Sequence, residues 1–331
     1  MFPALAQLPE DRSRLVPMAP GRLWLQDLGP EQGGAQAQPP VLLLHSLLVT
    51  GWDFRFLATP WASSREGRPA RRVLVPDLFG CGNSDRPPAA DTAGYSFAWH
   101  AELLARLLDK LAVPEIDLIG HGYGGAIAVH LAHRLERAGS RVGVRRLTLL
   151  APHMLPVDAP IALPGPVPRL RRAVRWVGLS PLVLRTVFRR ADLRRFLQRC
   201  LSTPDRLRSD ALRGDVDIYW DRLCRSGGLE AVEAMLSQID ALHALHATSR
   251  RHPHRDTRQN LYDAARSLRT PAMVVWGDRD TITPTIQAQR VAGLIPGAQL
   301  RIIEGCGHAP QRERPDALRR VIEAFDRRMQ S

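Results

Sequence analysis

The 331-residue sequence is almost without lysine: Lys110 is the single one, although the formal net charge is +13. Arginine therefore supplies nearly all of the positive charge. The simplest interpretation is a coding bias toward arginine, and the functional alternative is attraction to an acidic partner or to an anionic membrane surface. We expect no nucleic-acid partner.

Cysteine is scarce and scattered. No two of the four cysteines have the C-x-x-C spacing of a metal site or a redox pair. They are Cys81, Cys200, Cys224 and Cys306. The pattern indicates neither a zinc site nor a disulfide framework, and it fits a reducing cytoplasm. Cys81 and Cys306 adjoin motifs described below, where we interpret them as packing contacts rather than as reactive thiolates.

Long apolar runs are also missing. No uncharged segment approaches the roughly 18 apolar residues that a membrane-spanning helix needs. The first residues, "MFPALAQLPEDRSRLV", contain no continuous apolar stretch and include Glu10 and Asp11, which argues against a signal peptide. We therefore expect a cytoplasmic protein without a transmembrane segment.

The chain does contain short, wholly apolar runs, which are typical of strands buried on both faces of a parallel sheet. They are Val41–His45, Arg72–Asp77, Ile116–His121, Arg145–Pro152, Ala272–Gly277 and Leu300–Gly305. Helical patterns follow some of them, at Ser96–Leu111, Ala126–Ala138 and Pro315–Met329. The alternation predicts an α/β fold with a doubly wound, mostly parallel sheet.

The alternation stops between about residues 155 and 268, where only helical patterns remain, with breaks at Pro181, Pro204 and Gly227. We predict a core domain made of residues 1–154 and 268–331, and a helical cap of residues 155–267 over the carboxyl edge of the sheet. Within the cap, Arg169–Arg199 holds ten arginines against one acidic residue. This amphipathic, basic segment is either cap core or a contact for an acidic carrier protein or a membrane surface.

One glycine-rich turn follows a predicted strand and opens a predicted helix: "GHGYGG", residues 120–125. It has the frame of the nucleophile elbow, G-x-S-x-G, except that Gly122 occupies the place of the serine. The elbow holds its central residue at positive φ, so glycine relieves a strain of about 1–3 kcal/mol. Glycine also removes the hydroxyl, so no acyl-enzyme can form at position 122.

Four further stretches occur in a familiar order: "LLLHSLLVTGWDF", "VPDLFGCGNSDRP", "VVWGDRDTITP" and "EGCGHAPQRERPD". With the elbow frame, they resemble the α/β-hydrolase superfamily, in the capped branch related to epoxide hydrolases, dehalogenases and C–C bond hydrolases. The resemblance covers about residues 38–155 and 268–331. It implies that Asp280 is the catalytic acid, that His308 is the general base and that Ser84 is a structural serine.

His308 and Asp280 could work without a serine. A carboxylate on one imidazole nitrogen fixes the tautomer, so the other nitrogen becomes a positioned base for a bound water or for a substrate proton. The alternative is that both residues persist only through loop hydrogen bonds. Asp278, two residues earlier, is out of frame for the acid and is interpreted as a solvated loop residue.

The resemblance also implies an oxyanion site built from backbone N–H groups, those of Tyr123 and Leu47, which needs no serine hydroxyl. Ser46 stands where the family usually has glycine, so glycine and serine are exchanged between two loops. Ser46 is thus an alternative, relocated nucleophile, although the oxyanion loop is expected to hold its residue in a different direction. The other interpretation is a tolerated small residue.

The substrate pocket is predicted between the sheet and the cap, bounded by His45, Trp52, Phe79 and His121. Two other functions are weighed and set aside. The histidines of "HALHATSRRHPH", at 243, 246, 252 and 254, lack cysteine or carboxylate companions at ligand spacing, so we expect no metal. The turn at residues 120–125 does not meet the G-x-G-x-x-G spacing of a dinucleotide site.

Two classes of function remain. The first is a cofactor-independent enzyme in which His308 and Asp280 act by general base catalysis on a small or medium apolar substrate with a carbonyl group. Its reaction is hydrolysis of an ester, lactone or thioester, or lyase- or isomerase-type proton abstraction. The second is a catalytically silent protein that binds a hydrophobic ligand or an acidic carrier protein.

Overall fold

The computed structural model describes residues 11–31, 38–64, 69–137, 139–155, 186–203, 212, 214–243 and 255–328. Most of the basic segment 169–199 and the histidines at 246, 252 and 254 lie outside these residues. Within the described residues, no helix is long and apolar enough to cross a membrane.

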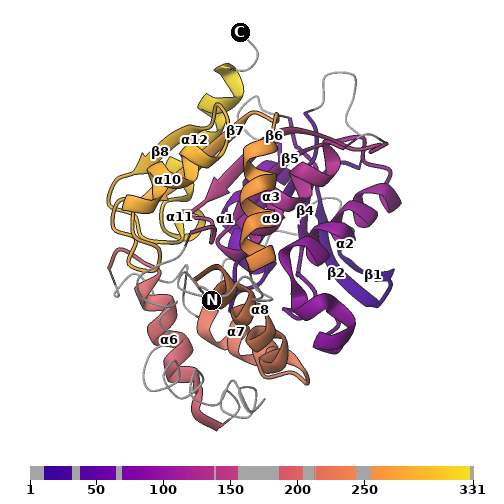
Figure 1. Cartoon of the computed structure of the whole chain (residues 1–331), viewed down its shortest axis with the longest axis vertical. Coiled ribbons are helices and arrows are strands. Elements are labelled where there is room, and N and C mark those ends of the chain that lie inside the picture. The colour runs from indigo at the N-terminus through magenta and orange to yellow at the C-terminus, as the bar shows by residue number, and fades with distance from the viewer. Residues whose placement is uncertain are drawn as a thin grey trace.

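Eight strands form one sheet in the order β1-β2-β4-β3-β5-β6-β7-β8 (Figure 1). Strands β3 to β8 run parallel, and β2 pairs antiparallel with both β1 and β4. The bounds are β1 Arg14–Met18, β2 Gly21–Leu28, β3 Val41–Leu44, β4 Val73–Pro76, β5 Glu115–His121, β6 Gly143–Leu150, β7 Ala272–Gly277 and β8 Gln299–Ile303. The doubly wound, mostly parallel sheet predicted from the sequence is confirmed.

The parallel strands form where the predicted apolar runs lie, because both faces of the inner strands are buried, whereas the edge strand β8 is only partly buried. Every residue of β3, β4 and β7 is buried. The first two strands, β1 and β2, have no counterpart among the predicted runs. In β2, buried residues alternate with half-buried ones over most of its length, and in β1 only Val16 is buried, which is typical of antiparallel strands near a sheet edge.

Helices cover both faces of the sheet. Alternate side chains of the central strands belong to two separate apolar clusters, one against α2, α3 and α10 and the other against α1 and α12. These helices are α1 Arg55–Ala62, α2 Phe97–Lys110, α3 Tyr123–Leu135, α10 Ile286–Leu294 and α12 Pro315–Arg328. The short helices η1 Gly51–Phe54, η2 Ala89–Tyr95 and α11 Pro310–Glu313 lie in the loops.

Four helices occupy the segment where the sequence shows no strand pattern: α6 Arg190–Arg199, α7 Asp215–Leu223, α8 Gly228–His243 and α9 Arg255–Ser267. In Figure 1, α6, α7 and α8 lie together beyond one end of the sheet, whereas α9 lies alongside α3. The cap assignment of residues 155–267 stays a prediction.

The strand order places a switch point between β3 and β5. The chain leaves β3 for β4 on one side and later enters β5 on the other, so a crevice is expected beyond the carboxyl ends of these two strands. The residues that follow them are His45–Ser46 and Gly122–Tyr123. The fold therefore brings the two exchanged residues of the sequence to the same place.

Candidate active site

His308 and Asp280 meet at the carboxyl edge of the sheet, on the loops after β8 and β7. Their side chains are 3% and 0% exposed, and His308 Nδ1 lies 2.8 Å from Asp280 Oδ2. The backbone N–H groups of Ile282 and Thr283 donate to Asp280 Oδ1 at 2.8 and 2.9 Å. The carboxylate thus accepts hydrogen bonds on both oxygens, so it serves as the acceptor that orients the imidazole.

The protonation of Asp280 follows from these contacts. Burial opposes its ionisation, but the positive character of His308 and the hydrogen bonds from His308 and Thr283 outweigh burial and hold the pKa of Asp280 below its usual range. An ionised carboxylate accepts only, so His308 Nδ1 carries a proton toward it. In the neutral imidazole, His308 Nε2 then has a free lone pair, which is the chemical requirement for a general base.

A second buried histidine fixes the backbone of His308. His121 Nε2 lies 3.0 Å from the carbonyl oxygen of His308, and the Gln311 amide nitrogen lies 2.9 Å from His121 Nδ1. Because the same Gln311 nitrogen donates to Asp53 Oδ2, it is also the donor to His121, and His121 Nε2–H donates to His308. Burial holds the pKa of His121 well below its usual range, so this link is a neutral one.

His45 has a similar structural task in the oxyanion loop. Its Nε2 accepts the Leu78 N–H at 2.9 Å, so its Nδ1–H donates to the Ser46 carbonyl oxygen at 2.8 Å. Complete burial lowers its pKa, which keeps the ring neutral. His45 therefore ties the loop that carries Ser46 to the loop after β4.

Gly122 adopts φ 52°, the left-handed turn that the elbow frame predicts. A Cβ built on Gly122 would overlap Ser46 Oγ and would lie 2.9 Å from Ser46 Cβ. The Ser46 hydroxyl, on a side chain that is almost fully buried, accepts the Tyr123 N–H at 3.2 Å. The hydroxyl of the oxyanion loop thus occupies the space in front of the elbow, against the backbone donor predicted for the oxyanion.

His153, which follows β6, is a site residue that the sequence analysis did not single out. Its N–H donates to the Gly122 carbonyl oxygen at 2.9 Å. Its ring stacks on that of His308 with centroids 5.6 Å apart and planes 11° apart. Its Cε1 lies 3.4 Å from the position of a Cβ on Gly122. The position next to Gly122 is therefore bordered by Ser46 on one side and His153 on the other.

A buried charge network joins α7 to the core beside this site. Asp215, at the first turn of α7, accepts Trp52 Nε1–H at 3.1 Å and Arg312 Nη2–H at 2.8 Å. Arg312 also pairs with Asp53, 3.2 Å from its Nε, and Tyr219 donates to the same carboxylate at 3.2 Å. Complementary charges offset the burial of each group. No sequence motif signals this network, since its members come from three separate segments.

The burial and contacts of the remaining predicted residues are these. Phe79 is fully buried and packs edge-on against Trp99. Leu47 is buried, and Ser84 donates to the Asp77 carbonyl oxygen and accepts the Trp24 N–H. Asp278 is exposed, whereas Cys81 and Cys306 are buried, and burial raises the pKa of the Cys81 thiol to about 12. Within the described part of the chain, no group of acidic, histidine and cysteine residues could hold a metal.

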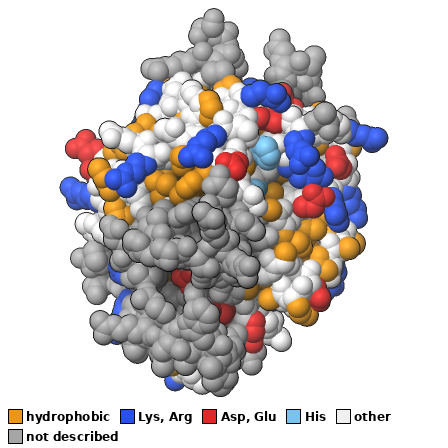
Figure 2. Space-filling view, in the orientation of Figure 1, with side chains coloured by type: hydrophobic (Ala, Val, Ile, Leu, Met, Phe, Trp, Pro, Cys, Tyr) orange, Lys and Arg blue, Asp and Glu red, His pale blue; other side chains and the backbone are white. Residues whose placement is uncertain are grey.

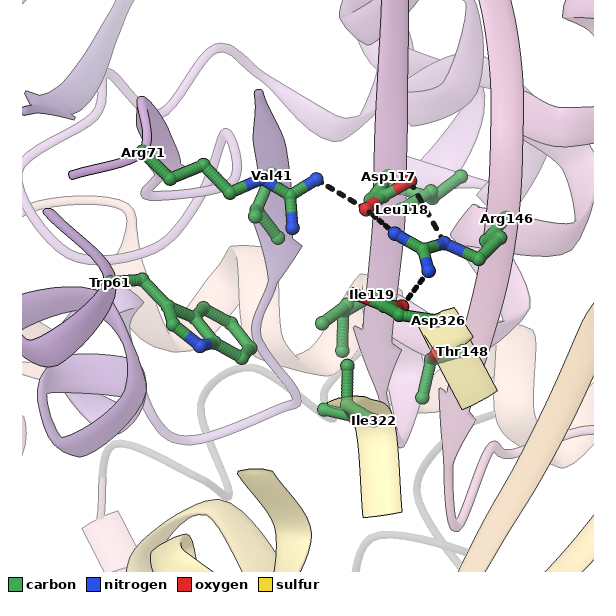
Figure 3. Close-up of a pocket in the computed structure, with 10 residues that line it drawn as sticks. All are labelled: Val41, Trp61, Arg71, Asp117, Leu118, Ile119, Arg146, Thr148, Ile322 and Asp326. Atoms are coloured by element: carbon green, nitrogen blue, oxygen red, sulfur yellow. Dashed lines mark hydrogen bonds and ion pairs between the residues drawn. The ribbon is translucent and has the colours of Figure 1, made fainter. Parts of the chain in front are cut away.

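A second cluster of buried charge lies at the opposite, amino-terminal end of the strands (Figure 3). There Asp117 of β5 accepts Arg71, Arg145 and Arg146, and Arg146 also pairs with Asp326 of α12. The adjoining cavity measures about 10 Å³, which is room for one water molecule. This cluster has no space for a substrate.

The fold and the site together define a class. A switch point in the strand order, an elbow turn at positive φ, and a histidine and a carboxylate on the loops after β8 and β7 are the features of an α/β hydrolase. The profile of the alpha/beta hydrolase fold family matches residues 39–315, and the chain belongs to this family.

Among the similar proteins, some carry hydrolase names. The chain is 31% identical over 265 residues to a 2-hydroxymuconate semialdehyde hydrolase of Pseudomonas putida, with 80% of each chain covered. It is similar to the crystal structure of Cfl2 from Burkholderia cenocepacia, with 26% identity, a TM-score of 0.73 and 97% of each chain covered. The epoxide hydrolase CorEH shares the fold at 18% identity, with a TM-score of 0.70 over 97% of this chain and 100% of CorEH.

Proposed function

We propose that this protein is a hydrolase in which His308, oriented by Asp280, acts as the general base on a small or medium apolar substrate that carries a carbonyl group. The observation that supports the proposal most is the 2.8 Å contact between His308 Nδ1 and Asp280 Oδ2, because it leaves Nε2 as the basic nitrogen. No cofactor is needed for this chemistry.

The reaction follows from the same geometry. His308 Nε2 takes a proton from a hydroxyl that attacks the carbonyl carbon, or from a carbon acid next to it, while backbone N–H groups of Tyr123 and Leu47 stabilise the oxygen that gains charge. Esters, lactones and thioesters meet these requirements. So does 2-hydroxymuconate semialdehyde, the substrate in the name of the Pseudomonas putida relative.

Turnover of a defined panel tests the proposal. The panel holds a short-chain p-nitrophenyl ester, a lactone, a thioester and 2-hydroxymuconate semialdehyde. We expect at least one substrate to be turned over and His308→Ala to lower kcat/KM by about 10³-fold or more, because loss of one member of such a couple removes most of the rate enhancement. The matched control is His133→Ala, on the outer part of α3.

Two results would count against the proposal. Equal kcat/KM for wild type and His308→Ala would show that the base is elsewhere. No turnover of any substrate, together with tight binding of a hydrophobic ester or acyl ligand, would favour the second function, a catalytically silent protein that binds a hydrophobic ligand or an acidic carrier protein.

A further inference from the structure

We propose that Ser46 is the nucleophile of this enzyme, and that its hydroxyl replaces the one that is missing at Gly122. The inference rests on the proposed function, since it names the group from which His308 takes a proton. It departs from the ordinary elbow arrangement, in which the nucleophile stands on the turn after β5.

The first argument is space. A Cβ on Gly122 would overlap Ser46 Oγ and would lie 2.9 Å from Ser46 Cβ, closer than real Cβ atoms approach. A side chain at position 122 and the observed Ser46 therefore exclude one another. The presence of serine at position 46 thus requires glycine at position 122, and the two departures from the family pattern are linked.

The second argument is register. Strands β3 and β5 pair in parallel with Leu44 opposite Gly120. Ser46 and Gly122 each stand two residues beyond this pair, in the loops that leave the two strands. The register therefore brings the two loop positions side by side, and a hydroxyl carried by either one reaches the same part of the site.

The third argument concerns the oxyanion donors. In the elbow arrangement, the two N–H donors belong to the residue after the nucleophile and to the oxyanion loop. Here these are Tyr123 and Leu47. If Ser46 is the nucleophile, Leu47 becomes the residue after it and Tyr123 the donor from the other loop. The pair of donors is unchanged, and Tyr123 N–H already lies 3.2 Å from Ser46 Oγ.

The proposed base, His308, is linked to position 122 through the ring of His153. The position in front of Gly122 is 3.4 Å from His153, whose ring stacks on His308, and the ring of His121 lies 4.9 Å from that of His308. Between the described side chains of Ser46 and His308 there is no direct hydrogen bond. Such bonds often tighten only in the substrate complex, and a rotation about the Cα–Cβ bond of Ser46 moves its hydroxyl.

The step balances with an ester. Ser46 Oγ forms a bond to the carbonyl carbon, its proton moves to His308 Nε2, and the carbonyl electron pair becomes the oxyanion at Tyr123 and Leu47. The tetrahedral species then expels the alkoxide, which takes the proton from His308. Water then gives a proton to the same nitrogen and attacks the acyl carbon, the bond to Ser46 Oγ breaks to release the acid, and Ser46 Oγ takes the proton back from His308.

Covalent labelling tests the assignment directly. A fluorophosphonate reacts with an activated serine by losing fluoride, and peptide mass spectrometry locates the adduct. We expect the label on Ser46, its loss in Ser46→Ala, and its retention in Ser140→Ala, an exposed loop serine. We also expect Ser46→Ala to lower ester kcat/KM by at least about 10³-fold in a protein that stays folded, with a small loss of Tm from the unpaired Tyr123 N–H.

Variants in which serine and glycine are exchanged test the argument from space. Gly122→Ser alone places two side chains in one space, so we expect a lower Tm and weaker activity than in the wild type. Ser46→Gly combined with Gly122→Ser restores the elbow arrangement. We expect this double variant to recover the wild-type Tm, to remain within about tenfold of wild-type kcat/KM, and to carry the label at position 122.

The inference is overturned by three results. They are an absence of label on Ser46 in the wild type, an activity of Ser46→Ala within threefold of the wild type, and a Gly122→Ser variant more stable than the double variant. If His308→Ala abolishes turnover while Ser46→Ala does not, the proposed function stands and a water molecule is the nucleophile. Loss of this inference is thus distinguishable from loss of the proposed base.

Discussion

Two buried carboxylates, at opposite ends of the same sheet, have opposite surroundings. Asp117, near the amino-terminal end of β5, is held by three arginines, of which Figure 3 shows Arg71 and Arg146. Asp280, after the carboxyl end of β7, is held by two backbone N–H groups, a threonine hydroxyl and one histidine. Both pKa values are lowered, since in each case the partners outweigh the opposing effect of burial.

The partners decide what each carboxylate can do. Guanidinium groups keep their charge at any physiological pH, even though burial lowers the pKa of Arg71 to about 10. The cluster around Asp117 is therefore fixed and serves stability. An imidazole can both accept and donate a proton, so the couple of Asp280 and His308 can serve chemistry.

The largest expected effect concerns activity at the Asp280 end. Asp280→Asn keeps the shape but turns an acceptor into a partial donor, so His308 loses the partner that fixes its tautomer. We expect kcat/KM for the best substrate of the panel to fall by about 10⁴-fold. Steady-state kinetics on purified protein measures this loss, and a decrease below tenfold would remove the functional contrast between the two carboxylates.

The next effect concerns stability at the Asp117 end. Asp117→Asn leaves three arginines without their shared anion, which we expect to lower the free energy of unfolding by about 3–5 kcal/mol. Urea unfolding measures this change. The folded fraction should keep wild-type kcat/KM, since the cluster lies at the end of β5 remote from His121. A loss of activity larger than tenfold in the folded fraction would contradict this division.

A smaller effect concerns the contribution of Asp117 to stability in acid. The folded-state pKa of Asp117 is lowered from 3.8 to about 2. A carboxylate of depressed pKa stabilises the fold above its unfolded pKa, and this stability is lost as pH falls through the folded value. Between about pH 4 and pH 2, Asp117 should account for a loss of about 2 kcal/mol.

The milder variant Arg145→Gln, which retains two of the three arginines, tests the acid effect without unfolding the protein at neutral pH. We expect its loss of stability between these pH values to be smaller than that of the wild type, as measured by unfolding at fixed pH. Identical pH profiles would show that Asp117 is not the group that titrates.

The smallest effect is a control for burial. Glu102 on α2 also contacts two arginines, Arg106 and Arg134, but all three side chains are more than a third exposed. We expect Glu102→Gln to change the free energy of unfolding by less than about 1 kcal/mol. A change as large as that of Asp117→Asn would mean that the number of arginines, and not burial, sets the cost.

The sequence predicted the parallel part of the fold because burial on both faces leaves a continuous apolar run. All six runs coincide with strands within about two residues at each end. It did not predict β1 and β2, since β2, "GRLWLQDL", carries polar residues between its buried ones and β1, "RLVPM", is short and contains a proline. On the face shown in Figure 2, the basic side chains of the described residues are scattered among acidic and apolar ones.

The site was predictable only where a motif spans neighbouring residues. Asp280 and His308 each stand in such a motif, and the chain brings them together. The sequence also shows that Ser46 and Gly122 are exchanged. It does not show that the Ser46 hydroxyl fills the space that a side chain at position 122 would take, because this depends on the register between β3 and β5. His153 and the network of Asp53, Asp215 and Arg312 depend on tertiary contacts alone.

The most direct test of the central claim is the tautomer of His308, measured by nitrogen NMR on protein with labelled histidine and assigned with His308→Ala. The neutral ring should carry its proton on Nδ1 and have a bare Nε2, and Asp280→Asn should change this state. A ring with the proton on Nε2, or one that Asp280→Asn leaves unchanged, would contradict the account.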